Sequence, residues 1–287
     1  MLTINLSIMK KIIVAIDGLK YSEGAANYAV QLAEKNNAHL VGVFLDDFTH
    51  HSYKMYDLVI GEGATDEKKE RFEQLDKETR QFATRSFENS CRKAGINYSV
   101  HHDRNIAIQE LIHESIYADL LVVAADETLT TYAENQPTQF IRELLNDVQC
   151  AVLVVPREYK PVGKVVILYD GEPSSVFAAR MFSYVLPALK ELEVEVVSVK
   201  NEKDGNHVPD NYLVKEFMKR HYPDARYTVL KGEPDTEIVN YLAEEEKETL
   251  VVLGAYRRSR VSRWFRQSMA DILLKELNVP LFIAHNK

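Results

Sequence analysis

Two Asp-Gly pairs, Asp17-Gly18 and Asp170-Gly171, are the first residues whose types suit ligand binding. Each pair follows a short apolar run and precedes a Ser and a helical pattern. A carboxylate at the end of a strand can accept hydrogen bonds from a ribose hydroxyl or an exocyclic amine, and glycine allows close approach of the backbone. The alternative is that Asp-Gly only makes a turn before a helix. The two pairs alone leave both interpretations open.

A second candidate is an arginine-rich loop that follows the apolar run TLVVLGA. It carries Arg257, Arg258, Arg260, Arg263 and Arg266. Guanidinium groups bind phosphate oxygens in a fixed, often bidentate geometry, so this loop predicts an anion site. Trp264 and Phe265 in the same loop suit stacking on a base or a protein partner, and they suit core packing equally well. The alternative for the arginines is a solvated surface that pairs with glutamates.

Other reactive side chains do not form a recognisable centre. His50 and His51 lie in a polar stretch, and the histidines of His101-His102-Asp103 should point to opposite faces of a strand. A metal site needs several convergent ligands, so we predict none. Cys91 and Cys150 have no partner at redox spacing, and no Gly-x-Ser-x-Gly sequence supports a hydrolase. We therefore predict no catalytic residues and no enzyme activity.

The candidate residues belong to an internal repeat. KKIIVAIDGLKYSEGAANYAVQLA resembles GKVVILYDGEPSSVFAARMFSYVL, and DLLVVAA and AVLVVP have the later counterparts TLVVLGA and PLFIAH. The second copy is shorter in its middle, where the stretch after its second strand, NEKDGNHVPD, is a short polar loop. The first copy instead has the long charged segment Asp66 to Ala94 after its second strand. That segment carries Phe72, Leu75, Phe82 and Cys91 on one expected face, ends at Gly95 and predicts a single extended helix. We predict two domains, residues 9–157 and 162–287, joined by the linker Pro156 to Pro161.

Short Val, Ile and Leu runs alternate with helical patterns in each copy, as is typical of a parallel sheet covered on both faces. Ser22 is expected to cap the first helix. The predicted strands are Ile12 to Ile16, Leu40 to Leu45, Tyr98 to His101, Leu120 to Ala124 and Ala151 to Val155, with counterparts near Val165, Val194, Tyr227, Leu250 and Leu281. This pattern predicts an α/β protein of two tandem, flavodoxin-like, doubly wound five-stranded sheets. The loops after the first and fourth strands should then meet at the ligand-binding edge.

Composition limits the function classes. The 287 residues are 46% hydrophobic and 27% charged, as in folded globular proteins, and the formal charge of −8 disfavours nucleic acid as the main partner. No apolar run is long enough to span a membrane. Two cysteines give no disulfide framework, and no secretory leader is recognisable, so we expect a cytoplasmic protein.

The loop LGAYRRSRVSRWFRQSMADILLKELNVPLFI resembles that of the universal stress protein family, whose ATP-binding members carry Gly-x-x-Gly, nine residues, then Gly and Ser or Thr. Gly254 and Ser268 match the first and last positions of this motif, whereas Arg257 and Gln267 replace the other two glycines. The resemblance covers both copies. It implies a stress-response protein in which close backbone wrapping of a triphosphate is largely lost.

The first copy departs further from the motif. Ala124 takes the first glycine position and Glu127 the second, and Thr138-Gln139 stands approximately at the last two. Asp126 and Glu127 would place negative charge where a phosphate should lie, which lowers affinity in a low-dielectric cleft. We therefore expect no phosphate binding in the first copy. Pro137 before Thr138 favours the start of a helix.

The resemblance also implies strand order 3-2-1-4-5, with Ala151 to Val155 lying beside Pro280 to Ala284 in an intramolecular version of the family's dimer contact. Three hypotheses follow. The protein acts through protein partners, including a possible homodimer, or a small ligand; its second domain binds ATP, ADP, AMP or another phosphorylated ligand; or it slowly hydrolyses a nucleotide. The first is favoured. The candidate ligand-binding residues are Asp170, Val199, Gly254, Arg257, Arg258, Ser268 and Asp17.

Overall fold

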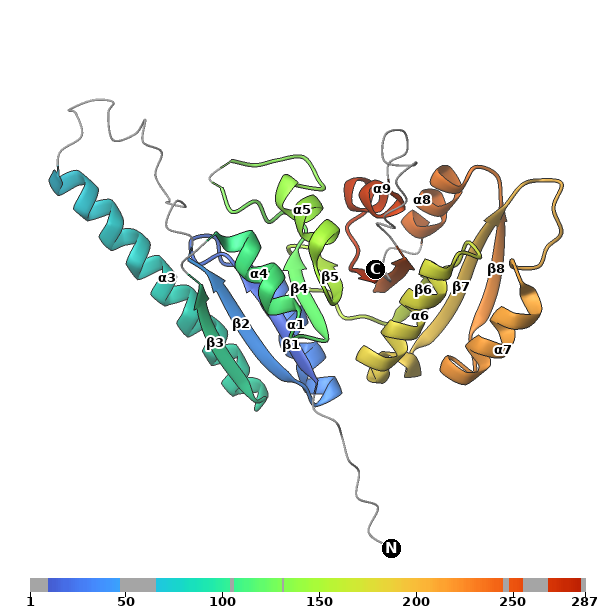
Figure 1. Ribbon diagram of the computed structural model, residues 1–287, viewed down its shortest axis with the longest axis horizontal. Helices are drawn as coiled ribbons and strands as arrows, with labels where there is room; N and C mark the ends of the chain where they lie inside the picture. Colours follow the sequence, from blue (N-terminus) through green and yellow to red (C-terminus); the bar gives the residue numbers. More distant parts are fainter. Residues whose placement is uncertain are drawn as a thin grey trace, which may run out of the picture. The chain divides into compact units, whose positions relative to one another are not determined.

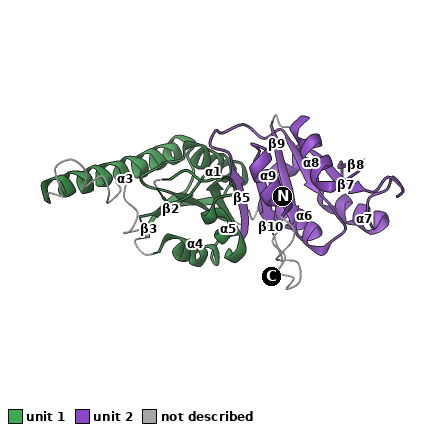
Figure 2. Ribbon diagram, turned by 90° about the horizontal axis from the view of Figure 1, so that it is seen from above, with its two compact units in different colours: residues 1–149 green, residues 150–287 purple. Residues whose placement is uncertain are grey.

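The computed structural model describes residues 10–46, 66–103, 106–130, 132–244, 248–254 and 268–284. The chain divides into two compact units, residues 1–149 and residues 150–287 (Figure 2). Both units are α/β structures in which helices cover the two faces of a sheet, as the alternation of apolar runs and helical patterns predicts. Among the described residues, no helix is both long enough and apolar enough to cross a membrane.

The first unit contains the sheet order β3-β2-β1-β4, with all three neighbouring pairs parallel. Helices α1 and α3 cover one face and α4 and α5 the other (Figure 2). The elements in chain order are β1 (Lys11–Ile16), α1 (Glu23–Asn36), β2 (His39–Leu45), α3 (Asp66–Ala94), β3 (Tyr98–Asp103), α4 (Ala107–Ser115), β4 (Leu120–Ala124) and α5 (Gln139–Asp147).

The second unit has the order β5-β10-β9-β6-β7-β8 (Figure 1). Strands β10, β9, β6, β7 and β8 are parallel, and they show the 3-2-1-4-5 order expected for the second copy. The elements are β5 (Ala151–Val155), β6 (Lys164–Leu168), α6 (Pro173–Val185), the 3₁₀ helix η1 (Pro187–Glu191), β7 (Glu193–Lys200), α7 (Asn211–His221), β8 (Arg226–Lys231), α8 (Pro234–Glu244), β9 (Thr249–Gly254), α9 (Met269–Glu276) and β10 (Leu281–Ala284).

Strand β5 joins the second unit although the repeat assigns it to the first copy. It pairs antiparallel with β10, with Leu153 opposite Phe282. This is the expected pairing of the last strands of the two copies. Because β5 hydrogen-bonds to β10, the boundary between the two compact units falls after Gln149. The domain limits 9–157 and 162–287 describe the two copies of the repeat, and they remain a proposal.

The central strands form because most of their residues are β-branched or leucine and are buried on both faces. Strands β4 and β5 are buried throughout, and β1 is buried after its first residue. Strand β3 extends to Asp103, two residues beyond the predicted end, because Phe44 and Leu45 of β2 supply ladder partners for His102 and Asp103. Long-range pairing of this kind is invisible in the local pattern.

Helix ends follow the capping rules. The Ser22 side chain accepts a hydrogen bond from the Ala25 backbone N–H and begins α1, and Thr138 begins α5 by accepting from the backbone N–H of Ile141. Both positions were predicted as helix starts. Asn37 ends α1 in the left-handed conformation that asparagine tolerates.

Helix α3 spans Asp66 to Ala94, the bounds predicted from the sequence. Its buried residues, Asp76, Ala83, Phe87 and Cys91, lie on one face. The predicted face was wrong apart from Cys91: Phe72 is half-buried, and Leu75 and Phe82 are exposed, because Ala83 and Phe87 turn a neighbouring side of the helix toward the sheet. The Phe87 ring stands against Gly42 in β2, where an added Cβ would lie 2.7 Å from ring atom Cε1. The absence of a side chain at Gly42 therefore allows α3 to approach the sheet.

We predict that Gly42→Ala lowers the free energy of unfolding by about 1–3 kcal/mol, because the new methyl group overlaps a buried ring. Urea denaturation of the full chain measures this. Gly205→Ala is the matched control, since an added Cβ there meets no atom within 4 Å. Combining Gly42→Ala with Phe87→Leu should restore part of the loss. Equal stabilities of Gly42→Ala and Gly205→Ala would contradict the packing argument.

Candidate functional site

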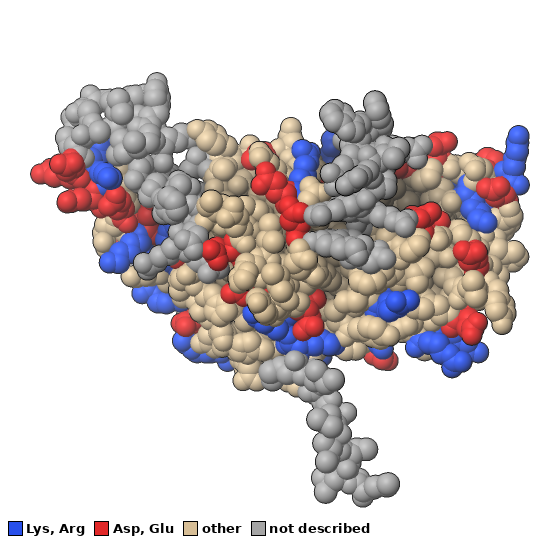
Figure 3. Space-filling view, viewed as in Figure 1, with Lys and Arg blue, Asp and Glu red and all other residues tan. Residues whose placement is uncertain are grey.

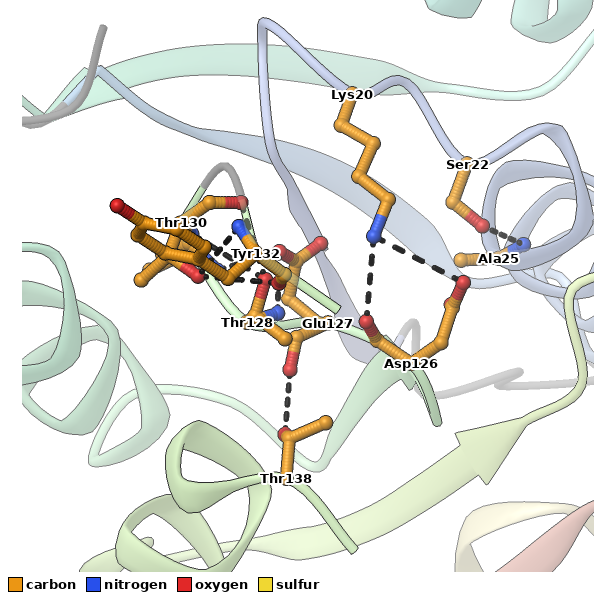
Figure 4. Close-up of polar contacts among 10 residues, drawn as sticks. Lys20, Ser22, Ala25, Asp126, Glu127, Thr128, Thr130, Tyr132 and Thr138 are labelled. Atoms are coloured by element: carbon orange, nitrogen blue, oxygen red, sulfur yellow. Dashed lines mark hydrogen bonds and ion pairs between the residues drawn. The ribbon is translucent and has the colours of Figure 1, made fainter. Parts of the chain in front are cut away.

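The loops after β1 and β4 meet in the first unit because these strands are parallel neighbours. The first loop contributes Asp17, Gly18 and Lys20, and the second contributes Asp126 and Glu127. Figure 4 shows Lys20 of the first loop reaching Asp126 of the second. The side chains of Asp17 and Glu127 are both buried, with only 1% and 4% of each residue exposed. Two carboxyl groups are thus removed from water at the edge where such sheets bind ligands.

The Glu127 carboxylate is bound by the backbone of its own loop. Its Oε1 accepts hydrogen bonds from the N–H groups of Thr128 at 3.0 Å and Leu129 at 2.9 Å. The Thr138 hydroxyl donates to the Glu127 carbonyl oxygen at 2.5 Å and ties the loop to the start of α5. Leu129 has a positive φ of 50°, an uncommon conformation for leucine. The loop therefore turns sharply around a carboxylate that it already binds.

Burial raises the pKa of Glu127 to about 7, and the negative charge of Asp17 adds to this effect. The two backbone N–H groups and the Lys20 ammonium act in the opposite direction. Lys20 reaches the Asp126 backbone oxygen at 3.5 Å and its carboxylate at 4.0 Å. Near neutral pH, Glu127 is divided between its charged and neutral forms.

Asp17 orders a turn before α1, which was the alternative to ligand binding for the Asp-Gly pair. Its Oδ1 accepts a hydrogen bond from the Leu19 backbone N–H at 2.8 Å, and its carbonyl oxygen accepts one from the backbone N–H of Lys20. The carboxylate therefore orders the β1–α1 loop. Because Asp17 is also buried, its carboxylate oxygens face the protein and not the solvent.

A charged cluster closes over Gly18. Asp46, after β2, accepts hydrogen bonds from Arg80 Nη1 at 2.7 Å and from His102 Nδ1 at 2.8 Å. A Cβ added at Gly18 would lie 2.9 Å from Asp46 Oδ1 and 3.0 Å from Arg80 Cγ. The space beside Gly18 is thus occupied by the side chains of Arg80, from α3, and Asp46, which follows β2. Sequence reasoning missed this cluster, because its three members come from separate elements.

In the second unit, Asp170 and Gly254 lie at the carboxyl ends of the neighbouring strands β6 and β9. Asp170 is exposed, unlike Asp17, and its Oδ1 accepts a hydrogen bond from the Glu172 backbone N–H. Gly171 has a φ of +89°, which favours glycine, and an added Cβ would lie 2.9 Å from the Pro209 ring. The polar loop after β7 therefore reaches back over this Asp-Gly turn.

Gly254 is required by packing. A Cβ there would lie 2.4 Å from the backbone carbonyl carbon and oxygen of Ser174, in the first turn of α6. Ser268 begins α9, where its hydroxyl oxygen accepts a hydrogen bond from the Ala270 backbone N–H at 3.3 Å. The two residues that match the family motif thus have local structural roles as well, so their presence alone does not identify a ligand.

The remaining predicted residues are not brought together by the described structure. Val199 is half-buried near the end of β7, opposite Leu230 of β8. Arg257, Arg258 and Gln267 lie outside the described residues, as do the other arginines of that loop, Trp264, Phe265, His50 and His51.

The adjacent histidines of β3, His101 and His102, make separate hydrogen bonds. His101 Nδ1 lies 2.6 Å from Glu114, whereas His102 bonds to Asp46, so the pair points to opposite faces as expected. Within the ranges that the structure describes, no three His, Cys, Asp or Glu side chains converge to hold a metal ion. Cys91 is buried and Cys150 is half-buried, and both are free thiols.

A cavity of about 530 Å³ lies away from all these residues. It opens where β7 and β8 begin and is lined by both charges, including Lys190, Glu193, Arg220 and Arg226. Since Asp170 and Gly254 follow the carboxyl ends of parallel strands, this cavity is at the opposite edge of the sheet. We assign the candidate site to the carboxyl edge, where loop glycines and carboxylates gather.

The sequence model of the Universal stress protein family matches residues 9–156 and again residues 162–285. The chain belongs to this family. A universal stress protein of Synechocystis is 19% identical over 289 residues, which cover 95% of this chain and 99% of that protein. The two matched segments agree with the repeat that the sequence showed.

Solved structures show the same fold. A universal stress protein from Archaeoglobus fulgidus aligns with a TM-score of 0.70 at 14% identity, covering 96% of this chain and 98% of the other. A protein of unknown function from Pseudomonas aeruginosa aligns with a TM-score of 0.59 at 15% identity, covering 97% and 93%. The tandem arrangement is therefore shared along nearly the whole chain.

The raised pKa of Glu127 predicts how stability depends on pH. Between about pH 4.5 and pH 7 the folded chain holds a proton on Glu127 that the unfolded chain releases, so the free energy of unfolding falls as pH rises. Relative to Glu127→Gln, which keeps an acceptor and stays neutral, the wild type should lose about 3 kcal/mol across this range. Denaturation at several pH values measures the difference.

Glu158→Gln is the control, because Glu158 is exposed and lies outside the site. Its stability curve should run parallel to that of the wild type. A constant difference between wild type and Glu127→Gln at all pH values would show that the pKa of Glu127 is the same in the folded and the unfolded chain, so that burial does not raise it.

Proposed function

We propose that this chain is a non-catalytic member of the universal stress protein family whose first half does not bind nucleoside triphosphates. It acts through protein partners or a small ligand in the cytoplasm. The observation that supports this proposal is the buried Glu127 carboxylate, which accepts hydrogen bonds from the Thr128 and Leu129 N–H groups. These are backbone donors of the loop that would have to hold a phosphate.

Charge and space both oppose an anion in the first half. A phosphate beside Asp17, Asp126 and Glu127 would lie among three carboxyl groups, of which two are buried. The region beside Gly18 is filled by Arg80 and Asp46. Arg80 could attract an anion, but it already bonds to Asp46 at 2.7 Å. The residues present therefore do not fit a bound triphosphate.

The same geometry argues against general-base catalysis by Glu127, although a pKa of about 7 would suit that role. One oxygen of its carboxylate accepts hydrogen bonds from two backbone N–H groups. Only 4% of the residue is exposed to solvent. A base has to reach the proton that it removes. We assign Glu127 a structural role in the loop.

A second candidate function is binding of an adenine nucleotide or another phosphorylated ligand in the second half. Asp170 is exposed at the strand end, Gly254 keeps the first glycine of the family motif, and Ser268, at the last position of the motif, begins α9. The arginine-rich loop would supply donors to phosphate. Pro209 against Gly171 limits the room beside the first loop.

Calorimetric titration of the full chain with ATP, ADP and AMP separates the two functions. Under the main proposal no heat of binding appears, and the melting temperature does not move at millimolar nucleotide. Under the second, micromolar binding appears, is reduced by Arg257→Ala with Arg260→Ala, and is unchanged by Asp17→Ala.

Binding that is lost in Asp17→Ala but kept in the arginine variant would overturn the proposal for the first half. Each variant should first be shown to melt like the wild type, because Asp17 also orders its own loop. Release of phosphate from ATP above the rate of buffer alone would overturn the non-catalytic assignment.

A further inference from the structure

Helix α3 carries a row of residues that the domain core does not use. Leu75, Thr79, Phe82 and Ser86, here called the α3 row, follow each other at spacings of four, three and four residues, so they lie along one side of the helix. Leu75 is 53% exposed and Phe82 is 63% exposed. Two large apolar side chains, two helical turns apart, are thus presented to solvent.

The row is distinct from the side of α3 that faces the unit. The buried side consists of Asp76, Ala83, Phe87 and Cys91, and Phe87 packs edge-on against Phe44. The α3 row lies about a quarter turn away around the helix. In Figure 1 the first half of α3 extends past the ends of β2 and β3.

Charge along α3 favours a second copy of the same helix as the occupant. Residues 66–79 include six acidic and four basic side chains, whereas residues 80–94 include one acidic and four basic. Figure 3 shows acidic side chains gathered at the free tip of α3 and basic ones further along it. Two copies in antiparallel orientation would place unlike halves opposite each other.

Side-chain size selects a register for this pairing. When the twofold axis passes between Arg80 and Gln81, Leu75 faces Ser86 of the second copy and Phe82 faces its Thr79. Each large side chain then meets a small one, which allows close packing. On the solvent side of the row, the exposed Glu78 and Arg85 are two turns apart and fall opposite each other in the two copies.

We propose that the chain forms a homodimer through antiparallel pairing of the α3 rows, with reciprocal Glu78–Arg85 ion pairs fixing the register. A twofold interface requires this self-complementarity, because each contact must occur twice with the roles exchanged. Nothing in the pairing depends on a nucleotide, so this inference is independent of the proposed function.

Sedimentation equilibrium of the full chain between about 1 and 200 µM tests the surface. The wild type should show a monomer–dimer equilibrium, and Phe82→Glu should raise the dissociation constant about tenfold or more. Gln81→Glu, which adds the same charge at a neighbouring exposed position off the row, should associate like the wild type. A wild type that stays monomeric, or a Phe82→Glu variant that dimerises normally, overturns the proposal.

The ion pairs provide a second test that does not depend on loss of folding. Glu78→Arg and Arg85→Glu should each be monomeric when alone, because like charges then meet twice across the axis. Mixed together they should form a heterodimer, since both contacts again join opposite charges. Failure of the mixture to associate, while each variant melts like the wild type, would overturn the antiparallel register.

Discussion

When two carboxylates are buried side by side, the protein must offset their negative charge with hydrogen-bond donors, cations or bound protons. In the first unit this requirement determines the shape of the loop after β4. Two backbone N–H groups, the Lys20 ammonium and a partly bound proton share the charge of Glu127. The backbone folds back so that the N–H groups of Thr128 and Leu129 point at the Glu127 carboxylate. This turn places Leu129 at a positive φ. The polypeptide thus arranges itself around its own anion, as other members of this fold class arrange a loop around a bound one.

The two halves show different outcomes of one duplicated architecture. In the first unit the carboxyl edge of the sheet is filled by Glu127 and by the Arg80–Asp46–His102 cluster. In the second unit Asp170 remains exposed, and Pro209 approaches Gly171 from the loop after β7. The strand order is retained because it depends on buried apolar runs, whereas the loop chemistry has diverged because it depends on a few polar side chains.

The sequence predicted the fold well because its information is local and repeated. Buried Val, Ile and Leu runs, helix caps at Ser22 and Thr138, and the bounds of α3 all follow from short-range patterns. The unfavourable charge at Glu127 was also predicted. What the sequence could not reveal is how that charge is satisfied, because the backbone geometry of residues 127–129 is not encoded by any single residue type. The contacts of Gly18 and Gly171 were missed for a related reason: each partner comes from a distant segment.

Helix α3 connects the two distinctive features of the first unit. It is much longer than α7, its counterpart in the second copy, and its middle turns supply both Arg80, which covers Gly18, and the α3 row. Thr79 and Arg80 are consecutive, so the side chain that closes the crevice and the surface available for association belong to one turn of one rigid helix. A ligand entering beside Gly18 would have to displace Arg80 from Asp46 and so disturb the seat of α3 on the sheet. The long helix α3 therefore both covers the Gly18 side of the carboxyl edge and presents an extended helical surface.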